Sequence, residues 1–439
     1  MALTKSILQF VFFLFCYGSY FSQAINPSLA EALQDKIDSI QNENNLQGIS
    51  AAVLIPGEGQ WSGVNWFSHN GNTISSDMEF GIASNTKLFT GVLMLKLIEN
   101  DLFNLDDSIY QFIPSYENID STITIRQLLN NTSGLADVTS VEGYPDSILS
   151  DPNRMYTASE LMTWAGPPSF APGTGWEYCN TNYLLCGMIA EATTGFSYAQ
   201  LLRDSILDPL DLDSTLLDVY EIIPYTIAHP WQGGMDNYSI PRTSLNSAAW
   251  SAGAMYSTSE EMIHWYDHLF NGDFLNSNSF NEMTTFVGSG DYGIGISEVT
   301  INGRIVWQHG GTIWGGYNSS MMYDTETGVI ICVLINQLPA QAYLVAIQLL
   351  QTVLNNSDLN QGELNDINAP FLYPNPSSNI VHIDVEEENL IRMDLLNSKG
   401  QIIKIIHSTE FDISDLPRGL YYVKILTKSK EVSYRLVRQ

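Results

Sequence analysis

One Ser-x-x-Lys motif occurs in the chain, Ser84-Asn85-Thr86-Lys87, where a loop meets an apolar stretch with helical spacing. Residues three apart on a helix share a face, so the motif places the lysine nitrogen beside the serine hydroxyl. The N-terminus of a helix also favours negative charge, and both effects help to make a serine nucleophilic. One such match is expected by chance among nine lysines, so the motif needs support from the rest of the chain.

A second segment with suitable chemistry is Tyr178-Cys179-Asn180, which opens a helical pattern. A phenol whose pKa is lowered by Lys87 would accept the serine proton and later protonate the leaving group. The Asn180 amide would donate a hydrogen bond to a substrate carbonyl. Considered alone, the tyrosine also fits a structural role as a helix cap.

A third segment, His309-Gly310-Gly311-Thr312, follows an expected hairpin. Glycines on a strand that faces a cleft let a substrate backbone approach closely. The backbone N–H groups of Thr312 and Ser84 would then form an oxyanion hole. Considered alone, the histidine also fits a buried strand end before a glycine-rich turn.

The elements expected around these segments define an α+β architecture, in which helices flank an antiparallel sheet and a helical lobe is inserted. Strand patterns occur at both ends of the segment 25–356, and residues 101–285 are mostly helical. A cleft between sheet and lobe would hold the catalytic groups. The expected strands are 49–55, 61–67, 299–307 with a hairpin turn at Asn302-Gly303, 319–323 and 329–335, and the expected flanking helices are 27–45 and 340–354.

The chain has 439 residues, enough for more than one domain. Residues 1–24 have the features of a secretory signal peptide: one lysine, a short apolar run and the small-residue end Ser22-Gln23-Ala24. Residues 25–356 would form the α+β domain, and the polar residues 357–371 are expected to form a linker. Residues 372–439 contain short alternating strands, typical of a small all-β sandwich.

Charge is unevenly distributed. Residues 25–370 contain 8 lysines and arginines against 39 aspartates and glutamates, a net charge of −31, whereas residues 371–439 contain 9 of each. This balance argues against nucleic-acid binding. No phosphate-binding loop, dinucleotide fingerprint or His-Glu-x-x-His motif occurs, so we expect no cofactor and no metal site. No structural disulfide is expected, since Cys179 and Cys186 would lie about 10 Å apart on one helix, and no membrane span is expected.

The motifs together resemble the class C β-lactamase-like serine hydrolases, because the segments at Ser84, Tyr178 and His309 follow in the order and spacing of that family. The family includes D-alanyl-D-alanine carboxypeptidases, D-amino-acid peptidases and esterases, and the resemblance covers about residues 28–355. It implies a β-lactamase/transpeptidase-like fold. Further similar stretches are 128–135, 172–173, 252–258 and 292–295.

The resemblance implies a role for each matching residue. Ser84 would be the acylated nucleophile, and Lys87 and Tyr178 would share the general acid and base work. The implied substrate-binding residues are Asn180, His309, Gly310, Gly311 and Thr312. Two positions depart from the family pattern: Asn131 replaces a usual histidine, which we interpret as a local structural change, and His309 stands where many members have lysine.

The histidine at position 309 bears on the substrate. Lysine would give the site a permanent positive charge for a carboxylate, whereas a histidine with an ordinary pKa is mostly neutral above neutral pH. We therefore expect neutral or cationic esters and amides, such as small esters or D-amino-acid peptides, to be better substrates than β-lactams. A true β-lactamase remains an alternative, as does an inactive binding protein that has kept the fold.

Residues 372–439 resemble a type IX secretion sorting domain of type A. The similar stretches are 373–377, 394–400, 413–421 and the basic end around Lys428 and Lys430. The resemblance implies that the type IX secretion machinery is a partner and that the protein crosses both membranes of a Gram-negative bacterium, to be secreted or held at the cell surface. A substrate-binding β-module is the alternative interpretation of this domain.

Overall fold

The computed structural model describes residues 24–223, 225–356, 372–373, 379–383, 385, 389–397, 401–417, 419–428 and 431–438. The expected signal peptide, apart from Ala24, and the expected linker at 357–371 lie outside these residues. Both therefore stay predictions, as do the limits of the domains.

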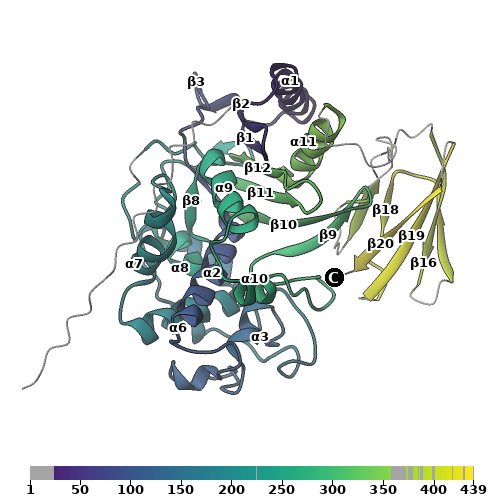
Figure 1. Cartoon of the computed structure of the whole chain (residues 1–439). Helices are drawn as coiled ribbons and strands as arrows, with labels where there is room; N and C mark the ends of the chain where they lie inside the picture. The colour runs from purple at the N-terminus through teal and green to yellow at the C-terminus, as the bar shows by residue number, and fades with distance from the viewer. Residues whose placement is uncertain are drawn as a thin grey trace, which may run out of the picture.

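A seven-stranded antiparallel sheet forms the centre of the larger domain (Figure 1). Its order is β3-β2-β1-β12-β11-β10-β9, so strands from both ends of the domain pair side by side, with Ala51 of β1 opposite Val333 of β12. The expected hairpin turn is present, because Asn302 and Gly303 both have positive φ, 52° and 83°. The strands are β1 Gly48–Ile55, β2 Gly59–His69, β3 Asn72–Thr73, β9 Ser297–Ile301, β10 Arg304–Ile313, β11 Tyr317–Asp324 and β12 Ile330–Ile335.

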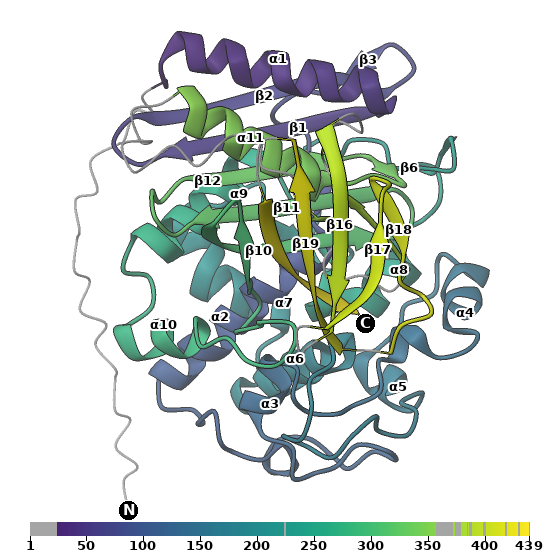
Figure 2. The same ribbon diagram turned by 90° about the vertical axis from the view of Figure 1, so that its right-hand side faces the viewer.

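Successive residues of the central strands face two different hydrophobic cores. Ala51 and Val53 of β1 belong to the core under α1 (Pro27–Asn44) and α11 (Ala342–Asn356), whereas Ala52 belongs to the core of the helical lobe. Figure 2 shows α1 and α11 together on the outer side of the sheet. Both faces of the sheet are thus covered, as the expected architecture requires.

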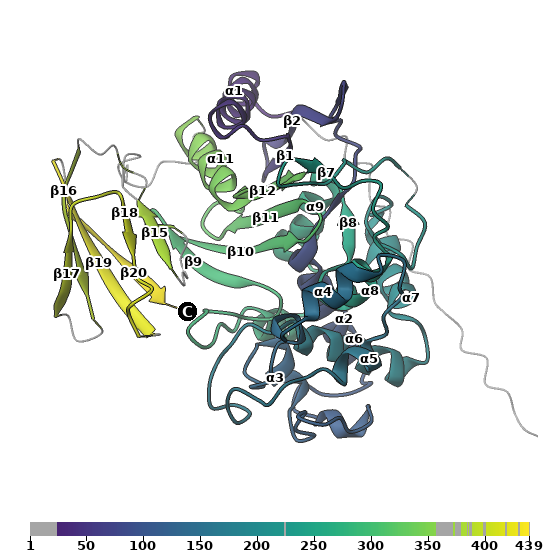
Figure 3. The same ribbon diagram turned by 180° about the vertical axis from the view of Figure 1, so that it is seen from behind.

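The helical lobe lies on the other side of the sheet from α1 and α11 (Figure 3). Together with short strands, it supplies the segments that face the nucleophile. The helices are α2 Thr86–Glu99, α3 Ile125–Leu129, α4 Tyr144–Ser150, α5 Ala158–Met162, α6 Asn180–Thr194, α7 Tyr198–Leu202, α8 Thr243–Gly253, α9 Ser259–Tyr266 and α10 Ser277–Met283. The short strands are β4 Phe80–Gly81, β5 Leu216–Leu217, β6 Trp231–Gln232, β7 Met235–Asp236, β8 Met255–Ser257 and β13 Gln337–Leu338.

Helix α2 passes through the middle of the domain. Every residue from Thr86 to Leu95 is buried, because α6, α8, α7 and α10 pack against the helix. The helical spacing in the sequence predicts the helix but not its burial on all sides. One consequence is that α2 carries Lys87 into the interior, where its side chain is 0% exposed.

The C-terminal strands form two small antiparallel sheets, β14-β15-β18 and β17-β16-β19-β20. Val381, Met393 and Val423 are among the buried residues of their shared core. The all-β character expected from the alternating sequence pattern is confirmed for the described part of this domain. The strands are β14 Leu372–Tyr373, β15 Ile380–Ile383, β16 Leu390–Leu396, β17 Ile402–Ile406, β18 Glu410–Asp412, β19 Gly419–Thr427 and β20 Glu431–Arg438.

Candidate active site

The Ser84 hydroxyl lies on a 3₁₀ turn, η1 (Ala83–Asn85), that leads directly into α2. The turn is fixed to the sheet, because Asn85 Nδ2 donates to Ser319 Oγ at 2.8 Å and Ser319 Oγ donates to the Ile82 carbonyl at 2.7 Å. Ala83 has a left-handed φ of 50°, which costs free energy for a residue with a side chain. Ser84 is thus presented from a strained turn that the sheet holds in place.

Three oxygen atoms surround the Lys87 nitrogen. Nζ lies 3.1 Å from Ser84 Oγ and donates to Asn180 Oδ1 and to the Ala252 carbonyl, both at 2.7 Å. Burial lowers the pKa of this amine to about 7, although the negative charge of Asp137 raises it. A neutral amine has two N–H donors and one lone pair. Because the two carbonyl oxygens can only accept, the lone pair is left for the Ser84 hydroxyl proton.

The Tyr178 ring lies beside Lys87, with Nζ 5.0 Å from the ring centroid. The expectation that Lys87 lowers the pKa of this phenol is wrong. Burial raises the phenol pKa well above its ordinary value and the neighbouring Tyr292 raises it further, against a smaller lowering by a hydrogen bond with Ser84. The physical reason is that the same burial disfavours charge on both groups, so Tyr178 stays a neutral phenol that can donate a proton.

His309 is a buried residue of β10 and is held as a neutral ring. Nδ1 lies 2.7 Å from the Gly310 carbonyl oxygen, which only accepts, so Nδ1 carries the hydrogen. Nε2 lies 3.0 Å from the Tyr292 hydroxyl, which therefore donates to it. Burial and the nearby Lys87 lower the pKa of His309 to about 3. The ring is neutral over a wider pH range than an ordinary histidine, which extends the sequence-based expectation.

Gly311 allows a close approach between β10 and the nucleophile turn, whereas a side chain on Gly310 would meet no close neighbour. A side chain on Gly311 would overlap the Ile82 carbonyl oxygen and the Ser319 hydroxyl. Strand β9 pairs with β10 only as far as Gln308, so the outer edge of β10 has no strand partner beyond that residue within the described chain. Thr312 lies on this part of β10 and lines the same cavity as Ser84, as an oxyanion hole requires.

Asn180 begins α6 and is engaged on both sides of its amide. Oδ1 accepts from Lys87, while Nδ2 donates to Asp137 Oδ2 at 2.9 Å and to Thr139 Oγ1 at 3.2 Å. The amide hydrogens expected to contact a substrate are therefore already used. Asp137 and Thr139 were missed by the sequence analysis, although they lie two and four residues after the matching stretch 128–135.

Asn131, which departs from the family pattern, supports the same region. It is fully buried and adopts a left-handed φ of 62°. Its Oδ1 accepts from the backbone N–H of Cys179 at 3.2 Å and from Asn182 Nδ2 at 2.9 Å. The side chain therefore fixes the backbone between Tyr178 and Asn180, which fits the local structural role expected for it.

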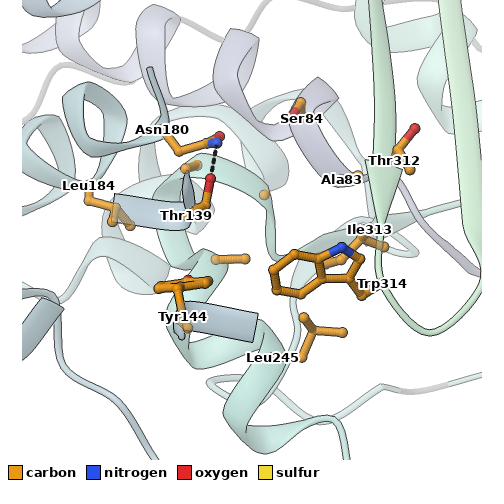
Figure 4. Close-up of a pocket in the computed structure, with 14 residues that line it drawn as sticks. Ala83, Ser84, Thr139, Tyr144, Asn180, Leu184, Leu245, Thr312, Ile313 and Trp314 are labelled. Carbon is orange, nitrogen blue, oxygen red and sulfur yellow. Dashed lines mark hydrogen bonds between the residues drawn. The ribbon is translucent and has the colours of Figure 1, made fainter. Parts of the chain in front are cut away.

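A cavity of about 250 Å³ opens beside Ser84. Figure 4 shows Ser84 and Asn180 on one side of it and the side chains of Tyr144 and Trp314 on the other, with Leu245 near the tryptophan. Most of its lining is apolar. The lining residues are Ala83, Ser84, Thr139, Tyr144, Asn180, Leu184, Leu245, Ala248, Ala249, Ala252, Gly253, Thr312, Ile313 and Trp314.

Among the residues that the structure describes, no group of three or more histidine, cysteine, aspartate or glutamate side chains could hold a metal ion. Three free cysteines in the described chain are buried, namely Cys179, Cys186 and Cys332. Within the same residues, no helix has the length and apolar character that crossing a membrane would need.

Comparison with protein families gives two matches. The family model described as Beta-lactamase matches residues 33–353, and the model described as Secretion system C-terminal sorting domain matches residues 371–439. Both families are those that the sequence motifs resemble, and the first match confirms the predicted fold class.

Curated relatives share part of the chain. Protein flp of Staphylococcus aureus strain MW2 is 33% identical over 202 residues, which are 44% of this chain and 38% of that protein. Penicillin-binding protein 4 of Amycolatopsis lactamdurans is 28% identical over 229 residues, covering 50% of this chain and 58% of that protein. The chain thus spans less than two thirds of the length of these relatives.

Solved structures resemble the larger domain. A D-stereospecific amidohydrolase from Streptomyces sp. has a TM-score of 0.63 and 27% identity, covering 73% of this chain and 97% of that chain. D-amino acid amidase from Ochrobactrum anthropi SV3, complexed with L-phenylalanine amide, has a TM-score of 0.67 and 26% identity, covering 75% and 99%. The similarity therefore extends over nearly the whole of both amide-cleaving proteins.

Proposed function

This chain belongs to the beta-lactamase family, and we propose on that premise that it is an exported serine hydrolase that is acylated on Ser84. The observation that carries the proposal is the environment of Lys87. Its buried nitrogen has two carbonyl acceptors and the Ser84 hydroxyl as neighbours, and its pKa is about 7. A base with a pKa near the working pH combines a useful neutral fraction with a useful affinity for a proton.

In the proposed acylation step, the neutral Lys87 amine takes the proton of Ser84 while Oγ attacks the substrate carbonyl carbon. The N–H groups of Ser84 and Thr312 stabilise the negative oxygen of the tetrahedral intermediate. The bond to the leaving group then breaks, and the leaving nitrogen or oxygen takes a proton from the Tyr178 phenol. The Lys87 ammonium returns a proton to Tyr178, and attack by water later releases the acyl group from Ser84.

We propose amides or esters with a neutral or cationic acyl part and an apolar side chain as substrates. The proposal rests on His309, which stays neutral, on the apolar cavity beside Ser84, and on the acidic surface of the domain. The similarity to proteins titled D-stereospecific amidohydrolase and D-amino acid amidase favours D-amino-acid amides or short D-peptides.

The alternative of a true β-lactamase is less well supported, since a penicillin carries a carboxylate and His309 provides no positive charge for it. The alternative of an inactive binding protein predicts no covalent chemistry. Both are separated from the proposal by parallel assays of p-nitrophenyl esters, D-phenylalanine p-nitroanilide and the cephalosporin nitrocefin. Preferred turnover of nitrocefin, or no turnover of any substrate, would contradict the proposed substrate class.

The acyl-enzyme itself is tested with a fluorescent phosphonate, which labels activated serines. We expect labelling of the wild-type protein and none of the Ser84→Ala variant. Ser133→Ala is a matched control, because Ser133 is a buried serine of the lobe that donates to Asn182 and not to Lys87. Equal labelling of wild type and Ser84→Ala would overturn the assignment of the nucleophile.

We propose that the C-terminal domain directs export through the type IX secretion machinery of a Gram-negative bacterium, since residues 371–439 match a secretion sorting model. The test compares full-length protein with a form truncated after residue 356 in a host that has this machinery. We expect the full-length protein at the cell surface or in the medium and the truncated form in the periplasm. Equal export of both forms would refute the proposal.

A further inference from the structure

Asp137 lies at the start of the 3₁₀ turn η3 (Val138–Ser140) and has all its acceptor positions occupied. Oδ1 accepts from Thr139 N at 2.9 Å and Thr139 Oγ1 at 2.8 Å, while Oδ2 accepts from Asn180 N at 3.2 Å and Asn180 Nδ2 at 2.9 Å. A carboxylate offers about four lone-pair positions. Asp137 therefore has none left for a substrate, and its role must act through the groups that it holds.

The first group that it holds is the Asn180 amide. An asparagine amide can be turned by half a rotation, which exchanges its oxygen and nitrogen, and the surrounding hydrogen bonds decide the orientation. Asp137 Oδ2 and Thr139 Oγ1 both take hydrogens from Nδ2. The oxygen Oδ1 must then point the other way, where it accepts from Lys87 Nζ at 2.7 Å.

The orientation of Asn180 decides how Lys87 can act. With Oδ1 and the Ala252 carbonyl as neighbours, both hydrogens of the neutral amine are used and the lone pair faces Ser84. With the amide turned round, Nδ2 would offer a hydrogen to that lone pair. The amine would then be bonded to Asn180 instead of accepting the proton of Ser84.

The charge of Asp137 acts on Lys87 as well. Helix α8 contributes no titratable group near Nζ, only the Ala252 carbonyl. The titratable groups packed around Nζ are Asp137 from the loop before η3, Tyr178 and Cys179 from the segment before α6, Tyr183 from α6 and His309 from β10. Burial raises the pKa values of the tyrosines and of Cys179, and it lowers that of His309, so these groups are neutral at pH 7. Asp137 is the carboxylate of this set, and its charge raises the pKa of Lys87.

We propose that Asp137 is a positioning residue of the hydrolase, which orients the Lys87 amine through Asn180 and controls the proton on that amine through its own charge. The inference rests on the proposed function, since it assigns how the base is prepared. It gives a catalytic reason for an aspartate that otherwise resembles a simple turn residue. Thr139 shares the orienting role but contributes no charge.

The test measures phosphonate labelling of Ser84 and kcat/KM from pH 5 to pH 9 in three variants. Asp137→Asn removes the charge, so the midpoint of the acid limb should fall by roughly one pH unit. Asp137→Ala frees the Asn180 amide, so kcat should fall by about 100-fold with KM little changed. Thr139→Val keeps the charge, so it should lower kcat without moving the midpoint.

Asp120→Asn is the matched control, because Asp120 makes the same two contacts with Thr122 that Asp137 makes with Thr139 but lies on the surface. It should leave the pH profile unchanged. An unchanged midpoint in Asp137→Asn, or an equal change in Asp120→Asn, would overturn the inference. Thermal melting of each variant separates these effects from loss of folding.

The pKa of Lys87 can also be measured without turnover, by NMR titration of the wild-type protein and Asp137→Asn with labelled lysine. A lower pKa in the variant supports the inference, and an equal pKa refutes it. Absence of any labelling at Ser84 in the wild type would instead refute the proposed function. The two failures are therefore distinguishable.

Discussion

Two buried titratable side chains precede and follow Ser84 in the sequence, and they differ in what surrounds them. Lys87 and Glu79 are both 0% exposed, and burial moves the pKa of each to about 7, downward for the amine and upward for the carboxyl. Lys87 has three oxygen neighbours, whereas neither oxygen of Glu79 has a hydrogen-bond partner among the residues that the structure describes. The nearby Glu261 and Asp218 raise the pKa of Glu79 further.

The comparison teaches that burial alone does not make a site. Desolvation shifts the pKa of both groups. At Lys87 the hydrogen-bond partners orient the neutral amine so that it can act as a base, whereas at Glu79 the partners are missing and burial only lowers stability. The region around Lys87 should therefore be sensitive in catalysis, and the region around Glu79 in folding.

The largest effect is expected for Lys87→Met, which keeps a similar shape and removes the base. The rate constant kcat should fall by about 10²-fold to 10⁴-fold, the usual contribution of general-base catalysis. Thermal stability should change little, because the cost of burying the amine is removed while the Asn180 and Ala252 oxygens lose their donor. Steady-state kinetics and melting curves check both parts. A variant that keeps a tenth of the activity would show that Lys87 is not the base.

The pH dependence of the wild-type enzyme should follow the same amine. Since only neutral Lys87 can accept the serine proton, kcat/KM should rise about tenfold per pH unit below pH 7 and level off above it. At pH 5 it should be about 100-fold below the plateau. A profile measured in one constant-ionic-strength buffer series checks this. Activity that is flat between pH 5 and pH 7 would contradict the assigned pKa.

Glu79 should affect stability and not the pH profile of catalysis. Its pKa in the folded protein lies above the ordinary value of 4.5, so the folded state binds the proton more tightly than the unfolded state. Stability should therefore fall as the pH rises from 4.5 to 7, by on the order of 2 kcal/mol. In Glu79→Gln this dependence should be lost. Urea unfolding at pH 5 and pH 8 measures it.

Glu31→Gln on the exposed side of α1 serves as the control for Glu79→Gln. It should unfold with the same pH dependence as the wild type. If Glu79→Gln also keeps the wild-type dependence, the buried carboxyl is not the source. A matching change in the control would point to a general surface-charge effect.

The smallest effect is expected for His309→Lys, which tests whether the neutral state of His309 determines the charge of the preferred substrate. A cation near the cleft should favour a carboxylate substrate over its methyl ester by about 1 kcal/mol, roughly fivefold in kcat/KM, and salt should weaken this preference. Matched acid and ester substrates at pH 8 and low salt provide the measurement. His309→Gln, which stays neutral, should leave the preference unchanged. A similar shift in both variants would contradict the electrostatic reason.

Local sequence spacing predicted the parts of the site that depend on local geometry. Ser84 and Lys87 lie together because they are three positions apart where the turn η1 continues into α2. The Asn302-Gly303 turn forms because both residues tolerate positive φ. The strand patterns at both ends of residues 25–356 also predicted the central antiparallel sheet. These features need little information about distant neighbours.

The properties of the site that the sequence did not predict depend on burial and on residues distant in the chain. The sign of the Tyr178 pKa shift was wrong because burial and the neighbouring Tyr292 raise this pKa, and nothing near residue 178 in the sequence indicates full desolvation. Asp137 was missed because its decisive partner, Asn180, is 43 residues away. The orientation of the Asn180 amide likewise becomes clear only when both of its sides are seen.

The absence of a side chain at Gly311 has a practical consequence for anyone who redesigns this enzyme. The backbone there is pressed against Ile82 and Ser319, whereas Thr312, Ile313 and Trp314 border open space. A mutant library over this stretch should therefore yield working clones with diverse residues at 312–314 and glycine alone at 311. Substrate selectivity can therefore be changed by substitutions at residues 312–314, provided that residue 311 stays glycine.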